Sequence, residues 1–486
     1  MKLSQIVQAG MPLDVRDCEI TGLENDSRLV EAGNLFIAYK GAQTDGRLYI
    51  EKAVSAGAAA VVYDPNNSPS LEHIPQDIPL IPIPDLAKQL FSIAGIFYDN
   101  PSQKIQVTGV TGTNGKTTVA YQLAQAHQFL GQGCAYIGTI GQGPVNHLSP
   151  INNTTPDILS LLKFFDSYVK QGLTRASIEV SSHALSQNRV GGVEFTQALF
   201  TNLTQDHLDY HHTMQAYAQA KALLFAREEL QYAIVNRDSP YHKVMLDAVQ
   251  PQVKKLTYSL KNPSDVQAVD WHMDVTGTSI AIQSIWGNYQ FKIQALGAFN
   301  IYNSLAVFSS LLVSGYSPTT VVGAMEQLKS APGRMEVVLD SPSVLVDYAH
   351  TPDALEKALS TLNQLKKGRL WVVFGCGGDR DKGKRPLMGR AASLYADTII
   401  VTSDNPRTED PRVIIEEVLQ GIPANISVTQ CINREEAIAY ALNSAEKEDI
   451  ILIAGKGHED YQQIGTSKQA FSDQEVVRRL AKKSKA

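Results

Sequence analysis

A glycine-rich loop between an apolar run and a helical pattern constrains this chain more than any other part of its sequence. Residues 105–110 form a β-type run, and residues 119–129 have a helical pattern. The loop between them contains Gly112, Thr113, Asn114, Gly115, Lys116, Thr117 and Thr118. Glycines allow backbone N–H groups to converge on an anion, and the start of a helix adds a favourable dipole. The unit therefore predicts a polyphosphate site in an α/β domain.

The residues at the start of the predicted helix suit a nucleoside triphosphate with a metal ion. Lys116 can reach the β- and γ-phosphates, and the hydroxyl of Thr117 can bind Mg²⁺. The stricter P-loop pattern requires glycine at position 110, where this chain has Val110. The alternative is a helix that starts after an ordinary structural turn. We favour the phosphate loop because strand, glycines, lysine and threonines fall in the expected order.

Length and charge narrow the class of protein. At roughly 150 residues per domain, 486 residues correspond to about three domains. The chain has 43 Lys and Arg against 49 Asp and Glu, a net charge of −6, which argues against a general binder of nucleic acids or acidic membranes. Its four cysteines lie far apart, its start shows no signal peptide, and no run approaches the ~18 apolar residues of a membrane span. We expect a soluble, cytoplasmic, multidomain enzyme.

The pattern of apolar runs divides the chain into three regions. In the first hundred residues, apolar runs at 35–38 and 59–63 and an amphipathic stretch at 86–97 predict a small α/β unit, which ends at the turn-forming residues 99–102. The second region alternates strands and helices, with strands at 105–110, 176–180, 198–201 and 233–235, helices at 119–129, 158–170 and 214–227, and antiparallel alternation at 268–296. Such alternation favours a parallel or mixed sheet flanked by helices.

The third region begins after residues 332–334 and again alternates buried strands with helices. The strands are predicted at 344–346, 370–374, 398–401 and 450–453, and the helices at 354–366, 385–395, 413–419 and 434–445. This pattern predicts a second doubly wound α/β domain, in which ligands bind at the carboxyl ends of the strands.

Carboxylate, imidazole and amine groups follow the strands of the second region. Glu179 ends the run 176–180, a position from which a carboxylate can hold Mg²⁺ beside a phosphate loop. Asp206 and His207 follow the next strand, and Lys221 comes later, within a helical pattern. The nearby histidines could suggest zinc, but no cysteine joins them and the carboxylates suit a hard cation, so we favour Mg²⁺. By spacing alone, Lys221 is a solvated helix lysine.

The stretch 111–118 resembles the ATP loop of the Mur ligase family, and the resemblance extends from residues 26–28 to residues 455–459. These ligases join an amino acid to a carboxylate through an acyl phosphate. The resemblance implies an α/β protein of three domains: an N-terminal uridine-nucleotide-binding domain at 1–100, a central P-loop ATPase domain with a mostly parallel sheet at 101–333, and a C-terminal Rossmann-like domain at 334–486.

The resemblance also implies a catalytic set and its cofactors. Lys116, Glu179, His207 and Lys221 match the catalytic positions, and two Mg²⁺ ions would be held by Thr117, Glu179, His207 and Lys221. In the family, the lysine matching Lys221 is carbamylated by CO₂ to N6-carboxylysine, which replaces a cation by an anionic oxygen ligand. The family's further contacts to ATP match Asn300, Asn303, Arg334, Asp347 and His350.

Two more residue sets follow from the resemblance. Contacts to the UDP-sugar dipeptide match Asn25, Ser27, Ala42, Gln43, Thr44, Asn153, Thr154, Thr155, Ser181, Gln187 and Arg189. Contacts to the added amino acid match Arg380, Asp404, Asn405, Pro406, Arg407, Gly455 and Glu459. The branch of the family with these residues adds meso-diaminopimelate to UDP-N-acetylmuramoyl-L-alanyl-D-glutamate. We expect this activity, with small-molecule substrates, no nucleic acid, no membrane span and a monomeric chain.

The amino acid that is added can be argued from Arg407. Diaminopimelate differs from lysine by one carboxylate beside its distal amine, and a guanidinium can hold a carboxylate with two parallel hydrogen bonds. Arg407 follows the predicted strand 398–401, and the alternative is that it pairs at the surface with Glu409 or Asp410. Two other functions stay open: a ligase like folylpolyglutamate synthases, and an ATP-dependent binding protein without catalysis.

Overall fold

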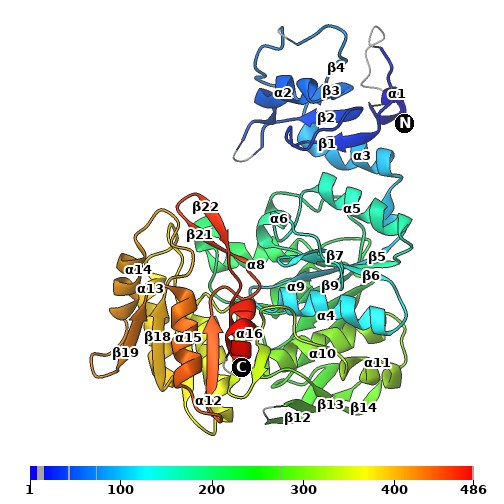
Figure 1. The fold of residues 1–486 in the computed structure, drawn as a ribbon. Coiled ribbons are helices and arrows are strands. Elements are labelled where there is room, and N and C mark those ends of the chain that lie inside the picture. Colours follow the sequence, from blue (N-terminus) through cyan, green and yellow to red (C-terminus); the bar gives the residue numbers. More distant parts are fainter. Residues whose placement is uncertain (8–15, 42–43, 73, 275, 484–486) are drawn as a thin grey trace.

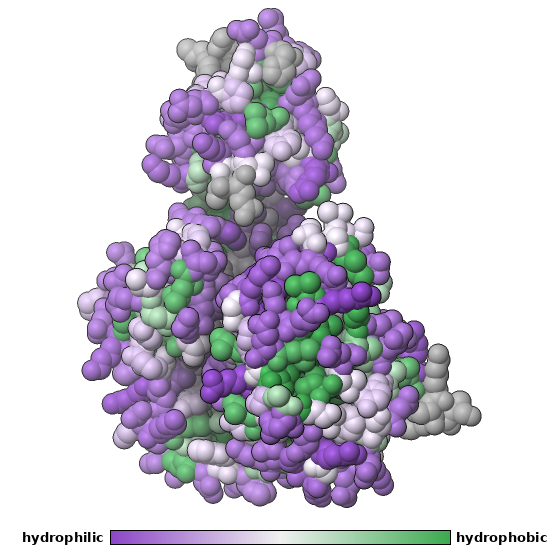
Figure 2. All heavy atoms as spheres, turned by 90° about the vertical axis from the view of Figure 1, so that its left-hand side faces the viewer, coloured by the Kyte–Doolittle hydropathy of each residue, from purple (hydrophilic) through white to green (hydrophobic). Residues whose placement is uncertain are grey.

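The computed structural model consists of three α/β units that follow one another along the chain, each built around its own sheet (Figure 1). It describes residues 1–7, 16–41, 44–72, 74–274 and 276–483. The second and third units lie side by side, and the first stands apart at one end of the molecule, as the space-filling view also shows (Figure 2). The expected α/β architecture of three domains with mostly parallel sheets is confirmed.

The first unit has a parallel sheet of four strands in the order β1-β2-β3-β4. The strands are β1 Gly22–Glu24, β2 Asn34–Ala38, β3 Ala60–Tyr63 and β4 Leu80–Pro82. The helices are α1 Leu3–Val7, η2 Gly46–Tyr49, α2 Ile50–Ser55, α3 Leu86–Tyr98 and η3 Pro101–Gln103. Helix α3 packs against α5 of the second unit, so a continuous apolar core joins the two units.

The second unit has a sheet of ten strands in the order β14-β13-β12-β11-β10-β9-β5-β8-β6-β7. Its strands are β5 Gln106–Thr111, β6 Cys134–Gly138, β7 Gly141–Pro144, β8 Arg175–Glu179, β9 Phe195–Phe200, β10 Tyr232–Asn236, β11 Lys254–Ser259, β12 Val266–Asp274, β13 Gly277–Ser284 and β14 Gly287–Ile293. The central strands are parallel, whereas β7, β13 and β14 pair antiparallel with their neighbours. The antiparallel excursion expected at 268–296 is therefore present.

Helices cover both faces of this sheet. They are α4 Lys116–Phe129, α5 Ile158–Lys170, α6 Ser182–Ser186, α7 Leu208–His211, α8 Met214–Ala222, α9 His242–Ala248, α10 Ala298–Val313 and α11 Pro318–Met325. The buried side of α4 packs with α10 on one face, and α5 and α8 lie on the other. Asp157 caps α5 by accepting hydrogen bonds from two backbone N–H groups, which fixes where that helix starts.

The third unit has a sheet of six strands in the order β15-β16-β20-β17-β18-β19, in which only β15 is antiparallel. Its strands are β15 Glu336–Asp340, β16 Ser343–Asp347, β17 Leu370–Phe374, β18 Thr398–Thr402, β19 Val428–Cys431 and β20 Ile450–Ala454, and a separate hairpin comprises β21 Tyr461–Ile464 and β22 Ser467–Ala470. Its helices are α12 Pro352–Leu365, α13 Lys384–Tyr395, α14 Pro411–Leu419, α15 Arg434–Ser444 and α16 Asp473–Lys483.

An ion pair inside the third unit fixes the end of its central strand. Arg434 in α15 and Asp473 in α16 are both fully buried, with Nε and Oδ1 2.8 Å apart. Arg434 also donates from Nη2 to the carbonyl of Ala454, the last residue of β20, at 2.9 Å. Because a buried charge is costly without a partner, the pair holds both helices and the strand end in one arrangement.

One sequence expectation is corrected, and some strands were not predicted. Helix α8 ends at Ala222 and not at residue 227, because the next residues form tighter i to i+3 hydrogen bonds that bury Leu224 and Phe225. The edge strand β15 and the hairpin β21–β22 had no strong apolar signal, since most of their side chains are partly or fully exposed. Within the described ranges, no helix combines the length and the apolar character that crossing a bilayer requires.

Candidate active site

The carboxyl ends of the parallel strands of the second unit place the phosphate loop beside Glu179. β5 and β8 are parallel neighbours, with Val110 opposite Glu179. The loop after β5 and the carboxylate at the end of β8 therefore lie side by side at the carboxyl ends of these strands. Gly112 has φ +149°, and a Cβ there would lie 1.9 Å from Thr201 Oγ1. Gly115 has φ +87°, and its Cβ would lie 2.4 Å from Asn303 Oδ1. Only glycine fits these positions, which accounts for the loop sequence.

Lys116 lies folded into this loop. Its Nζ donates to the carbonyls of Gly112 and Thr113, both at 2.8 Å. Burial lowers the pKa of Lys116, while the negative charges of Glu179 and Asp206 oppose that effect. Its amine therefore lies at the mouth of the loop, where the β- and γ-phosphates of a nucleotide would meet it.

Two residues that directly follow strand β9, Thr201 and Asn202, hold the backbone of the phosphate loop. Asn202 follows β9; its Oδ1 accepts from the backbone N–H of Asn114 and its Nδ2 donates to the Asn114 carbonyl, both at 3.0 Å. Thr201 Oγ1 donates to the same carbonyl at 2.6 Å. These two residues were not predicted as site residues, although they lie in the polar stretch before Asp206. Their contribution is to fix the loop backbone.

Thr117 and Glu179 form a pair of oxygen ligands suited to Mg²⁺. Thr117 Oγ1 donates to Glu179 Oε2 at 3.0 Å, and Glu179 is fully buried. Thr139 donates from its backbone N–H to Glu179 Oε1 at 2.9 Å. Hydroxyl and carboxylate oxygens are ligands of hard cations, so the predicted first Mg²⁺ position fits these residues. Thr118, next in the helix, is buried and lines the same cavity.

Lys221 is a buried amine, with 1% of its surface exposed, so its reading as a solvated helix lysine is wrong. Its Nζ donates to the Gly112 carbonyl at 2.9 Å and lies 4.5 Å from the centre of the Tyr217 ring. Burial and then the nearby charge of Lys116 hold the pKa of Lys221 well below its usual range. A neutral amine is the form that CO₂ modifies, so the side chain fits the predicted carbamate.

His207 lies near the same aromatic ring. Its ring centre is 6.1 Å from that of Tyr217 and 4.8 Å from that of His183, and its Nε2 is 3.4 Å from Asp206 Oδ2. Burial lowers the pKa of His207. Among the described residues, no three His, Cys, Asp or Glu side chains gather as a metal site.

The ATP residues predicted in the second and third units face one cavity of about 1100 Å³. Its lining includes Thr113, Asn114, Gly115, Lys116, Thr117, Thr118, Glu179, His207, Lys221, Asn300, Asn303, Arg334, Asp347 and His350. Arg334 bridges the two units, since its Nη2 donates to Thr117 Oγ1 at 3.3 Å and its guanidinium lies 4.3 Å from the centre of the Tyr348 ring. The structure thus brings this predicted set together.

The predicted contacts to the UDP-sugar dipeptide form a network next to this cavity. Thr155 Oγ1 donates to the Glu179 carbonyl at 2.8 Å and accepts from the Ser181 N–H at 3.0 Å. Arg189 donates from Nη1 to the Thr155 carbonyl at 3.3 Å and from Nε to Gln187 Oε1 at 2.8 Å. Thr154 and Ser181 line the cavity itself, and Asn153 is exposed in the loop before them.

The first unit contributes the remaining predicted UDP contacts. Asn25 donates from Nδ2 to the hydroxyl of Tyr39 at 3.4 Å, Ser27 is buried, and Thr44 is exposed. Ala42 and Gln43 lie outside the described residues. None of the described members of this group lines the cavity of the second and third units. A ligand that reaches both groups must therefore extend from the first unit toward Ser181.

The predicted amino-acid residues gather at the carboxyl ends of β18 and β20. Asn405 donates from Nδ2 to Glu459 Oε2 at 2.8 Å. Gly455 has φ +111°, and a Cβ there would lie 2.7 Å from Asp404 Oδ2. The buried amine of Lys456, which was not predicted, donates to Glu459 Oε2 at 2.9 Å. Of this group only Arg380 lines the large cavity, so the set forms an adjoining site.

Arg407 follows Pro406 in this loop, and its alternative role as a surface ion pair is wrong. Its Nη1 donates to the Gly378 carbonyl at 2.6 Å, whereas Glu409 pairs with Arg385 at 2.8 Å. Arg407 has φ 51°, and the hairpin β21–β22 holds its backbone, because Arg407 N–H donates to the Gln463 carbonyl at 3.1 Å. A left-handed backbone at a non-glycine residue is costly and is concentrated at binding sites.

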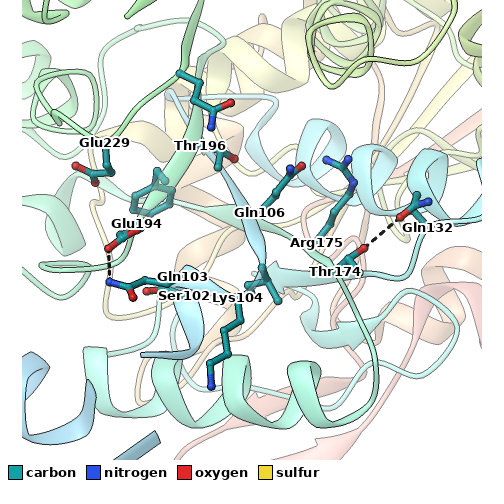
Figure 3. Close-up of a pocket in the computed structure, with 13 residues that line it drawn as sticks. Ser102, Gln103, Lys104, Gln106, Gln132, Thr174, Arg175, Glu194, Thr196 and Glu229 are labelled. Carbon is teal, nitrogen blue, oxygen red and sulfur yellow. Dashed lines mark hydrogen bonds between the residues drawn. The ribbon is translucent and has the colours of Figure 1, made fainter. Parts of the chain in front are cut away.

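A second pocket of about 570 Å³ lies at the amino ends of the parallel strands of the second unit, at the opposite end of these strands from the phosphate loop (Figure 3). Gln106 at the start of β5 and Arg175 at the start of β8 line it. Across from them, Gln103 donates from Nε2 to Glu194 Oε1 at 2.6 Å. None of the residues predicted from the sequence is among the described residues that line it.

Comparison with known proteins agrees with this architecture. The Mur ligase family catalytic domain matches residues 19–98, the Mur ligase middle domain matches residues 110–311, and the Mur ligase glutamate ligase domain matches residues 333–457. These three matches follow the order of the three sheets along the chain.

Full-length relatives and a solved structure extend the match. The UDP-N-acetylmuramoyl-L-alanyl-D-glutamate–2,6-diaminopimelate ligase of Coxiella burnetii is 44% identical and covers 98% of this chain and 99% of its own. The enzyme of that name from Haemophilus influenzae is 42% identical, covering 95% and 96%. A solved structure of such a ligase, 37% identical, has a TM-score of 0.71 and covers 100% of this chain and 99% of its own. The chain therefore belongs to the Mur ligase family.

Proposed function

We propose that this chain is an ATP-dependent ligase that joins meso-diaminopimelate to the D-glutamate carboxylate of UDP-N-acetylmuramoyl-L-alanyl-D-glutamate, a step in peptidoglycan precursor synthesis. One observation carries the proposal. The phosphate loop of the second unit and Arg334, Asp347 and His350 at the start of the third unit line one cavity. The proposed amino-acid site adjoins that cavity, and relatives named for this reaction match nearly the whole chain.

The reaction needs two bond exchanges in one place. The γ-carboxylate of D-glutamate attacks the γ-phosphorus of ATP, ADP leaves, and an acyl phosphate forms. The free amine of diaminopimelate then attacks the acyl carbon, phosphate leaves, and the amine loses a proton. Lys116 lies where it can offset the charge that builds up on the transferred phosphoryl group. Arg334 brings a second cation to Thr117 from the other unit.

The proposed cofactors are ATP, two Mg²⁺ ions and a CO₂-derived carbamate on Lys221. Thr117 and Glu179 would hold one ion, and His207 with the carbamate of Lys221 would hold the other. When bound, the ions would reduce the repulsion between the substrate carboxylate and the γ-phosphate. The burial of Lys221 beside the phosphate loop supports the carbamate, because burial favours the neutral amine that reacts with CO₂.

We propose domain boundaries at residues 1–100, 101–333 and 334–486. We also propose that the chain is a monomer that takes small-molecule substrates. It would act in the cytoplasm, where ATP and UDP-linked precursors occur. Asn25, Ser27 and the turn around Thr44 would hold the uridine nucleotide. Thr155, Ser181, Gln187 and Arg189 would hold the sugar dipeptide, since they already form one hydrogen-bonded network at the cavity.

The direct test measures phosphate release and product mass together. With ATP, Mg²⁺, the UDP-dipeptide and diaminopimelate, the chain should release one phosphate for each UDP-tripeptide formed. With a folate and glutamate it should release none. Addition of glutamate to a folate would favour the ligase of the folylpolyglutamate synthase kind, and ATP turnover without any new amide bond would favour a protein without ligase chemistry.

Replacing Lys221 by alanine tests the carbamate. Lys221→Ala should lose nearly all activity, because the anionic ligand is lost, and should regain part of it with millimolar acetate or a similar short carboxylate that can occupy the space. Gln219→Ala, which alters an exposed residue of the same helix, should keep wild-type activity. A folded Lys221→Ala with full activity in the absence of added carboxylate would contradict the assignment.

Replacing Arg407 by alanine tests the choice of amino acid. Hydrogen bonds to charged groups contribute about 1.5–3 kcal/mol, so Arg407→Ala should lower kcat/KM for diaminopimelate by about tenfold to a few hundredfold. Lysine lacks the second carboxylate, so the kcat/KM for lysine should change little. Arg412→Ala, an exposed guanidinium on α14, is the matched control. Equal losses for the two amino acids, or a wild-type preference for lysine, would show that Arg407 does not select the substrate.

A further inference from the structure

The two oxygens of the Glu179 carboxylate receive different kinds of donor. Oε1 accepts from the hydroxyl of Tyr136 at 2.5 Å and from the backbone N–H of Thr139 at 2.9 Å. Oε2 accepts from two hydroxyls, Thr117 Oγ1 at 3.0 Å and Thr139 Oγ1 at 3.3 Å. A backbone N–H can only donate, whereas a threonine hydroxyl can rotate and accept instead. Oε1 is therefore anchored, and Oε2 is the oxygen that can be released to a cation.

Tyr136 has no freedom to leave Glu179. It lies in β6, which pairs with β8, and its side chain is fully buried. The ring of Tyr121 in α4 packs against it edge to face, with ring centres 5.8 Å apart. The backbone N–H of Ile140 donates to the Tyr136 hydroxyl oxygen at 3.4 Å, which leaves the phenol proton directed at Glu179.

The contact between Tyr136 and Glu179 also requires glycine at position 138. A Cβ at Gly138 would lie 2.2 Å from Glu179 Oε1 and 2.3 Å from the Tyr136 hydroxyl. Glycine at this position therefore admits the phenol and the carboxylate into the same space. The tyrosine, the glycine and the carboxylate form one built arrangement, which shares one edge of the sheet with the phosphate loop.

We infer that Tyr136 is a positioning residue that holds Glu179 by Oε1 and so presents Oε2 beside Thr117 to the cation of the nucleotide. The inference rests on the proposed role of Glu179 as a metal ligand. Mg²⁺ requires near-ideal octahedral geometry, while Ca²⁺ tolerates flexible geometry. A carboxylate fixed by a phenol and an N–H group thus favours the smaller ion. Hydrogen-bond partners of metal ligands commonly change metal affinity by about 10- to 100-fold.

Tyr136→Phe tests this inference, since it removes the hydroxyl and keeps the ring. Mn²⁺ binding is measured by electron paramagnetic resonance in the presence of ADP, and Mg²⁺ and Ca²⁺ affinities follow from competition with Mn²⁺. Tyr136→Phe should weaken Mg²⁺ binding about tenfold or more and weaken Ca²⁺ binding less, so the Mg²⁺/Ca²⁺ preference should fall. Tyr121→Phe, which alters the neighbouring ring, should leave both affinities unchanged.

Two further variants separate the outcomes. Glu179→Gln should lower Mg²⁺ affinity more strongly than Tyr136→Phe; if it does not, Glu179 is not the metal ligand and the inference falls with that assignment. Gly138→Ala, whose Cβ would displace both the Tyr136 hydroxyl and Glu179 Oε1, should also weaken Mg²⁺ binding, and wild-type affinity in folded Gly138→Ala would overturn the anchored arrangement. Wild-type Mg²⁺ affinity in folded Tyr136→Phe, with Glu179→Gln impaired, would overturn the role of Tyr136 while leaving the proposed ligase function intact.

Discussion

The hydrogen bond between Thr117 and Glu179 is the contact on which the rest of the site depends. It joins the first turn of α4 to the end of β8 at 3.0 Å, and it exists because β5 and β8 are parallel neighbours whose carboxyl ends share one edge. Parallel strands that end together bring backbone N–H groups, a hydroxyl and a carboxylate to one place without help from a long loop. The phosphate loop and the proposed cation site both adjoin this pair.

The second constraint is the junction between the second and third units. Arg334 donates to Thr117 from the start of the third unit, and Gly333 lies so close to the turn after β20 that a Cβ there would be 2.2 Å from the carbonyl carbon of Gly457. The same turn continues into Glu459, which belongs to the proposed amino-acid site. In the proposed function, the phosphate loop of the second unit would bind the phosphoryl donor and the third unit would bind the amine, so this junction would set the distance between the two half-reactions.

Much of this could be predicted from the sequence, because parallel strands are continuous apolar runs and their ends carry the polar groups. The loop at 112–118 and the position of Glu179 follow from that rule. Tyr136 could not be found in this way, since a buried tyrosine in an apolar strand looks like core until its hydroxyl is placed opposite a carboxylate on another strand. Lys221 was assigned by family resemblance alone, because its burial depends on packing of α8 that spacing does not reveal.

The central claim is that carboxylate activation at the phosphate loop precedes amide formation and does not depend on Arg407 in the proposed amino-acid site. Borohydride reduces an acyl phosphate to an alcohol, which mass spectrometry detects on the UDP-dipeptide. In the absence of diaminopimelate, the trapped alcohol should appear with the wild-type chain and with Arg407→Ala at similar rates, and it should be nearly absent with Lys116→Ala. Trapping at the wild-type rate in Lys116→Ala, or trapping in the wild type only when diaminopimelate is bound, would contradict the account.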